Sequence, residues 1–113
     1  MKRDARALIW DALDAARSVA GFIDGLTEAA YLADPLRRAA VERKCEIIGE
    51  ALNRLSRQAP QMAAAIPDLP RIIGFRNVLI HGYASVDDRL VWRTITHELP
   101  ALRAQLEALL PSP

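Results

Sequence analysis

The chain has 113 residues, a length typical of one domain that buries a modest core without metals or disulfides. Hydrophobic residues make up 51% and charged residues 26%, which is a globular rather than a disordered composition. The net charge of +1, from 15 basic and 14 acidic side chains, argues against a protein that coats nucleic acid through bulk positive charge, so we expect any such contact to be local.

The first half of the chain has the apolar spacing of two long helices. A stripe at steps of three and four residues predicts a helix over residues 2–23, formed by Ile9, Ala12, Ala16, Val19 and Ile23. Gly25 and Thr27 interrupt it, and "EAAYLA" predicts a short helical turn. Asp34 is a suitable cap before Pro35, and a second stripe continues to about residue 57, formed by Val41, Cys45, Ile48, Leu52 and Leu55.

Two further helices follow a connector at residues 58–70, which has room for one more helical turn. "RIIGFRNVLIH" is expected to begin after Pro70 and to end at Gly82 in the left-handed conformation. Ser85 and Asp88 suggest a capping box for the last helix. Its apolar residues continue in heptad steps through a kink at Pro100, and they are Trp92, Ile95, Leu99, Leu102, Leu106 and Leu109.

These elements predict an all-α fold, an up-and-down bundle of four main helices plus a short helix. Residues 1–110 form one expected domain, and residues 111–113 form a disordered tail. The lone Cys45 excludes an intrachain disulfide, and no apolar run has the length of a membrane span or a secretory signal. We therefore expect a cytoplasmic protein without a membrane partner, in which Cys45 is a core residue.

Arg76 stands in the middle of the apolar arc of the third main helix. At about 100° per residue, Ile72 and Ile80 lie about 40° to either side of it, while Asn77 and His81 lie at about 100° and 140°. Burying a guanidinium without a partner costs several kcal/mol, so an acid is expected nearby. The second helix offers three, at i and i+4 spacing, and they are Glu42, Glu46 and Glu50.

Two readings of Arg76 remain open at this point. One is a structural ion pair between helices, which is common in bundles. The other is functional, because His81 and Tyr83 follow at the helix end and add an imidazole and a phenol. A cation, a proton-transfer group and a positioning hydroxyl suit phosphoryl chemistry. A terminal histidine also fits the helix dipole, and a tyrosine there can simply pack.

The spacing Arg76, four residues, His81, one residue, Tyr83 resembles the R-x4-H-x-Y signature of HEPN ribonucleases. The wider string "IIGFRNVLIHGYASVDDRLVWRTITHELP", with "EIIGEALNRLS" upstream, is similar to the HepT toxin branch of that family. HepT proteins pair with a minimal nucleotidyltransferase called MntA. The likeness runs from about Asp34 to Leu102 and is densest around the motif.

The resemblance implies a homodimer whose shared cleft cleaves RNA without a metal or cofactor, with the 2′-hydroxyl as nucleophile. In that mechanism Arg76 would hold the scissile phosphate and His81 would transfer protons. Asn77 would either orient one of these two side chains or make a second contact with the phosphate. Glu46 or Glu50 would partly neutralise Arg76. Tyr83 would be the residue to which the MntA-like antitoxin attaches AMP, which blocks the cleft.

Three functions are alternatives to an RNA endonuclease toxin. A non-catalytic HEPN module could present RNA or a nucleotide to the nucleotidyltransferase, and a purely structural dimer is a third possibility. The intact arginine, histidine and tyrosine set favours the nuclease. A metal hydrolase is disfavoured because His81 and His97 lack ligand spacing. Trp92 is expected in the core or an interface, and His97 on the surface.

Overall fold

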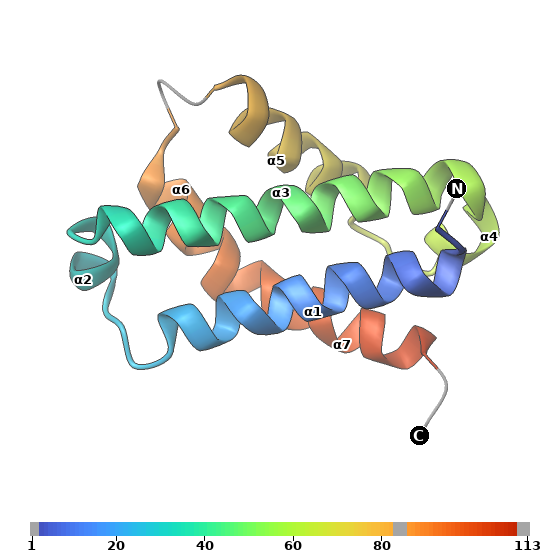
Figure 1. The fold of residues 1–113 in the computed structure, drawn as a ribbon, viewed down its shortest axis with the longest axis horizontal. Coiled ribbons are helices and arrows are strands. Elements are labelled where there is room, and N and C mark those ends of the chain that lie inside the picture. Colours follow the sequence, from blue (N-terminus) through green and yellow to red (C-terminus); the bar gives the residue numbers. More distant parts are fainter. Residues whose placement is uncertain (1–2, 83–85, 111–113) are drawn as a thin grey trace.

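The computed structural model describes residues 3–82 and 86–110, and within these ranges the chain is helical without a strand (Figure 1). The elements are α1 (Ala5–Ile23), α2 (Glu28–Leu32), α3 (Pro35–Gln58), α4 (Pro60–Ala63), α5 (Leu69–His81), α6 (Asp88–Arg93), the π-helical turn η1 (Thr94–Glu98) and α7 (Leu99–Leu109). The predicted all-α class is confirmed. The four main expected helices are α1, α3, α5 and the succession of α6, η1 and α7, while α2 is the short one and α4 lies in the connector.

The core lies mainly between α1 and α3, which run antiparallel along each other (Figure 1). The stripe predicted for α3 is buried throughout, and so is that of α1 except for Ile23 at its end. Leu102 and Leu106 of α7 complete the same cluster. A second cluster joins α2, α6 and η1, where the rings of Tyr31 and Trp92 lie 5.2 Å apart between centroids.

Helix α5 lies against α3 and is held by few buried side chains. Among its residues only Leu69, at the start, and Leu79, near the end, are buried. Leu79 belongs to the second cluster, with Val41 and Cys45 of α3. These contacts fix both ends of α5, and side chains between them, among them Asn77 and Val78, stay exposed.

Helix ends follow the sequence at several positions. The side chain of Asp34 accepts a hydrogen bond from the backbone N–H of Arg37 at 3.0 Å, so the predicted cap of α3 is confirmed. Gly25, with φ of 75°, is the one described residue in the left-handed region. Thr27 does not merely interrupt α1, because its hydroxyl caps α2 by accepting from the N–H of Ala30 at 3.1 Å.

Two predicted helix ends were wrong. Gly82 ends α5 at φ −106° and ψ 23°, with its N–H bonded to the carbonyl of Val78 at 2.8 Å, so the left-handed conformation is not used. The cap of α6 is Asp87 rather than the expected pair of Ser85 and Asp88. The Asp87 carboxylate accepts hydrogen bonds from the backbone N–H groups of Arg89 and Leu90. Ser85 lies outside the described residues.

Next to Pro100, where the sequence predicts a kink, the structure contains the π turn η1. Proline has no N–H, and its ring clashes with the carbonyl four residues earlier in a regular helix. The wider turn relieves this clash, and the N–H of Leu99 donates to the carbonyl of Thr94, five residues back. The hydroxyls of Thr94 and Thr96 donate to the carbonyls of Leu90 and Trp92 at 2.8 and 2.7 Å. The helix therefore changes its winding there and continues.

Candidate functional site

Arg76 projects from α5 toward α3, as its place in the apolar arc predicts. Its stem lies directly against Gly49, where α3 has no side chain. The Nε atom is buried and has no hydrogen-bond partner among the described residues. The Nη1 end reaches farther out and donates to the Oδ1 of Asn77 at 2.9 Å. The arginine therefore has a buried stem and a tip beside a polar side chain, an arrangement that long cationic side chains favour.

The expected acidic partner of Arg76 is not formed within the described chain. Glu46 lies 3.4 Å from Arg43, and Glu50 lies 2.9 Å from Arg54, in each case between side-chain N and O atoms. Both pairs are local to α3. The supporting roles of Glu46 and Glu50 at the site therefore stay predictions, and the guanidinium retains its charge for another ligand.

His81 is the last residue of α5 and is exposed. Its direction from the helix axis differs from that of Arg76 by about 140°, so the two side chains leave α5 on different faces. Tyr83 lies outside the described residues. The structure thus brings Arg76 together with Asn77, while His81 stands about one and a half turns further along the same helix.

A polar groove of about 520 Å³ lies beside the N-terminal half of α3 and the start of α6. Its charged lining residues are Arg38, Glu42, Arg43, Glu46 and Asp88. Partial burial raises the pKa of the Glu42 carboxyl, and nearby Asp88 raises it further, whereas Arg38 acts in the opposite direction. Sequence reasoning noticed Glu42 and Glu46 only as candidate partners of Arg76 and missed this groove.

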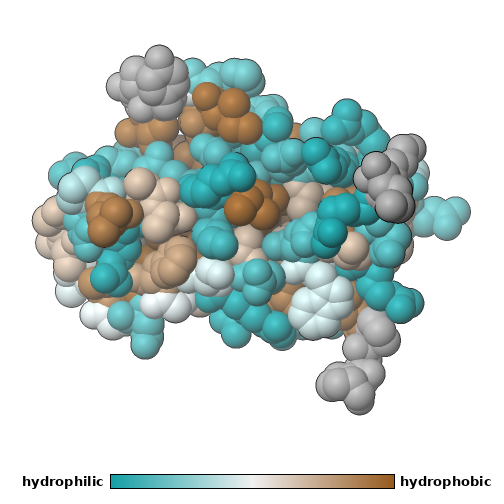
Figure 2. Space-filling view, viewed as in Figure 1, coloured by the Kyte–Doolittle hydropathy of each residue, from teal (hydrophilic) through white to brown (hydrophobic). Residues whose placement is uncertain are grey.

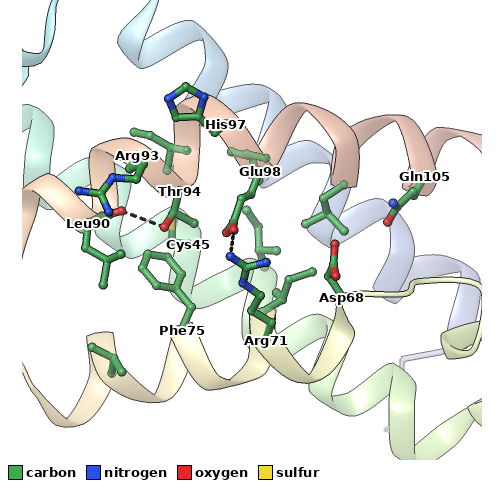
Figure 3. A pocket seen from close by; sticks show the side chains of 16 residues that line it. Cys45, Asp68, Arg71, Phe75, Leu90, Arg93, Thr94, His97, Glu98 and Gln105 are labelled. Carbon is green, nitrogen blue, oxygen red and sulfur yellow. Dashed lines mark hydrogen bonds and ion pairs between the residues drawn. The ribbon is translucent and has the colours of Figure 1, made fainter.

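An apolar cavity of about 440 Å³ separates α5 from η1 and α7 (Figure 3). Cys45 of α3 contributes to its lining, and burial raises the pKa of this thiol to about 12. Arg71 on α5 and Glu98 at the end of η1 form an ion pair at the cavity. Phe75 projects from α5 into the cavity. The apolar pattern of the sequence does not predict this cavity, because the cavity depends on how α5, η1 and α7 diverge in space.

The surface near the end of α5 is partly apolar. Val78 is 51% exposed and Leu90 of α6 is 41% exposed, and both line the mouth of the cavity. Figure 2 shows hydrophobic surface over the C-terminal part of α5. His97 is exposed as predicted, and Trp92 is half-buried against Tyr31. Among the described residues, no group of three His, Cys, Asp or Glu side chains is placed to hold a metal ion.

The family description "Ribonuclease HepT-like" matches residues 12–109, nearly the whole chain. The chain belongs to the HepT-like ribonuclease family. A HepT-like relative from Thermococcus cleftensis, named "Probable ribonuclease HepT", is 31% identical over 111 residues, which is 96% of this chain and 98% of the relative. The resemblance drawn from the motif is therefore confirmed at the level of the family.

Two other relatives carry the name of a candidate RNase. One, from Methanocaldococcus jannaschii, is 30% identical over 106 residues, which cover 94% of this chain and 96% of the relative. The other, from Caldanaerobacter subterraneus, is 34% identical over 88 residues, or 78% of each chain. No solved structure gives a significant match. Within the described HepT-like chain, no helix is both long and apolar enough to cross a membrane.

Proposed function

We propose that this HepT-like protein is a metal-independent RNA endonuclease, and that it acts as the toxin of a toxin–antitoxin pair. The observation that carries the proposal is the guanidinium of Arg76, which is held on α5 with its tip beside Asn77 and, among the described residues, bonds to no acid. The names of the relatives, which refer to ribonucleases, support the same reaction class. A fixed cation at a surface is suited to a phosphate diester.

In the proposed reaction the 2′-hydroxyl of the RNA attacks the adjacent phosphorus, and the bond from phosphorus to the 5′-oxygen of the next nucleotide breaks. The products are a 2′,3′-cyclic phosphate and a 5′-hydroxyl. Arg76 stabilises the negative charge that develops on the phosphate oxygens, and Asn77 holds its guanidinium. His81 transfers a proton, either from the nucleophile or to the leaving oxygen.

A second copy of the chain completes this site. Arg76 and His81 leave α5 about 140° apart, and a second copy would bring an arginine and a histidine to opposite sides of one phosphate. The exposed Val78 lies on α5 between them in sequence and offers apolar surface for such a contact. In this arrangement the C-terminal part of α5 from each subunit of a homodimer lines one shared cleft.

Regulation is proposed to act on Tyr83, two residues beyond His81. A nucleotidyltransferase partner would attach AMP to its phenol, which adds negative charge and bulk two residues from the proton-transfer group. RNA phosphate would then be repelled and excluded together. The partner of this type is the MntA-like antitoxin, and the compartment proposed for both proteins is the cytoplasm.

The direct test is cleavage of labelled RNA by the purified protein in EDTA. We expect cleavage with 2′,3′-cyclic phosphate ends, which EDTA leaves unchanged, and loss of at least about 100-fold on Arg76→Ala. Arg71→Ala is the matched control, because it removes an arginine of the same helix that is paired with Glu98. RNA binding without cleavage would favour a non-catalytic HEPN module, and activity that EDTA abolishes would require a metal.

A further inference from the structure

Helices α3 and α5 approach each other most closely where Arg76 meets Gly49. A methyl group placed on Gly49 would lie 2.1 Å from the Cβ and 2.5 Å from the Cγ of Arg76, and 3.5 Å from its Cα. The first two distances are far below carbon–carbon contact, and the atoms involved are next to the backbone of α5. A flexible side chain could move away, but here α5 itself would have to shift.

This contact determines where the guanidinium of Arg76 can lie. The first two carbons of the side chain are fixed against the backbone of α3, and the buried Nε follows them. Only the Nη end extends to the bond with Asn77. An arginine side chain normally loses much rotamer freedom when it is ordered, and in this protein the packing against Gly49 has already removed part of it.

We propose that Gly49 is a positioning residue for Arg76: its missing side chain sets the depth of α5 against α3 and thereby the place of the guanidinium. The link to catalysis rests on the proposed ribonuclease function, whereas the link to the guanidinium does not. A displacement of about 1 Å in a group that stabilises a transition state lowers a rate by roughly 10²-fold.

Gly49→Ala tests the proposal because it changes stability in two opposite ways: the higher helix propensity of alanine stabilises α3, whereas the clash of the methyl group with Arg76 destabilises the packing of α3 against α5. Alanine inside a helix is favoured over glycine, so the variant would gain stability and a higher melting temperature if the methyl group met open space. Gly21→Ala supplies this reference. Gly21 lies within α1, is exposed, and an added Cβ there has no neighbour within 4 Å.

The first measurement follows the Nε–H group of Arg76 by ¹⁵N NMR, with the signal assigned through its loss in Arg76→Lys. In the wild-type protein we expect this proton to exchange with solvent at least tenfold more slowly than that of the exposed Arg57. In Gly49→Ala the signal should shift and the protection should fall, while Gly21→Ala leaves both unchanged. An unchanged signal in a folded Gly49→Ala protein overturns the proposal.

The second measurement separates positioning from stability. Single-turnover cleavage is compared with the affinity for an RNA analogue that carries 2′-deoxyribose and cannot react. Gly49→Ala is expected to cleave at least about tenfold more slowly per folded molecule, with affinity within about threefold of wild type. A lower melting temperature with an unchanged rate would make Gly49 a packing residue only and would overturn the proposal.

Failures of the two proposals are distinguishable. If the wild-type protein cleaves no RNA, the proposed function fails, and the NMR measurement still decides whether Gly49 places Arg76. If Gly49→Ala does not fold, the wild-type exchange rate decides, because an Nε–H of Arg76 that exchanges as fast as that of Arg57 would contradict a fixed side chain.

Discussion

Arg38 of α3 donates a hydrogen bond to Asp88 in the first turn of α6, with 2.8 Å between Nη1 and Oδ2. The two side chains are only 25% and 29% exposed, so the pair is better shielded from water than the other ion pairs of α3. It joins segments 50 residues apart and fixes the point at which the chain returns to α3 after α5. Loss of Arg38 would leave Asp88 near Glu42 without compensation.

Arg38→Ala is therefore expected to lower the free energy of unfolding by about 1–2 kcal/mol. Urea denaturation at pH 7 measures this difference. Arg43→Ala is the control, because its partner Glu46 lies on the same helix and the Arg43 side chain is 66% exposed. Equal stability of the two variants would contradict a structural role for the pair of Arg38 and Asp88.

Glu42→Gln should stabilise the protein at neutral pH. Partial burial, and then Asp88, raise the pKa of Glu42 above its ordinary value of 4.5, so its ionised form is less favourable in the folded state. This penalty is absent below pH 4.5 and develops as the pH rises through the raised pKa. We expect Gln to raise the melting temperature by roughly 1–3 °C at pH 7 and by less at pH 4. A gain at pH 7 that Glu50→Gln reproduces would point to net charge instead.

The sequence predicted most of the fold because the fold depends on local periodicity. The stripes of α1 and α3 are set by which residues avoid water, and their spacing alone indicates the buried face. The ends of helices were predicted less well. Asp87 and Ser85 are both ordinary capping residues, and only the path of the chain decides which one accepts the N–H groups.

The sequence predicts only those features of the candidate site that depend on a single helix. Arg76 was recognisable because a cation in an apolar arc is unusual, and its side chain does face α3. Its contact with Gly49 depends on the distance between two helices, which the sequence of neither one contains. The apolar cavity beside Phe75 likewise results from the divergence of α5 from α7. An isolated glycine inside a helical pattern was the one available signal for Gly49.

His81→Ala should abolish RNA cleavage and leave the fold intact. The side chain is exposed at the end of α5, so its removal disturbs little packing, whereas proton transfer typically contributes 10²-fold or more. His97→Ala is a matched control, because His97 is the other histidine of the chain and is also exposed. Circular dichroism should give equal helicity for both variants. Cleavage at the wild-type rate by folded His81→Ala would remove histidine from the mechanism.

The protein is expected to form dimers that Val78→Asp disrupts. Val78 is 51% exposed on α5, and a carboxylate there would be buried without a partner in the proposed interface. Light scattering at micromolar concentration should report a dimer for the wild type and a monomer for the variant, with loss of cleavage. Leu36→Asp is the control, since Leu36 is 82% exposed in the first turn of α3. A wild-type monomer would contradict the shared cleft.

Tyr83→Phe should separate regulation from catalysis. The substitution keeps the ring and removes the hydroxyl that would accept AMP, so we expect RNA cleavage within about tenfold of wild type but no silencing by the nucleotidyltransferase partner. The assay is incubation of both proteins with ATP and Mg²⁺, followed by intact mass and cleavage measurements. Wild type should gain AMP and lose activity in parallel. Tyr31→Phe is the control, because Tyr31 is the other tyrosine and is fully buried. Equal AMP gain by Tyr83→Phe would move the switch to another residue.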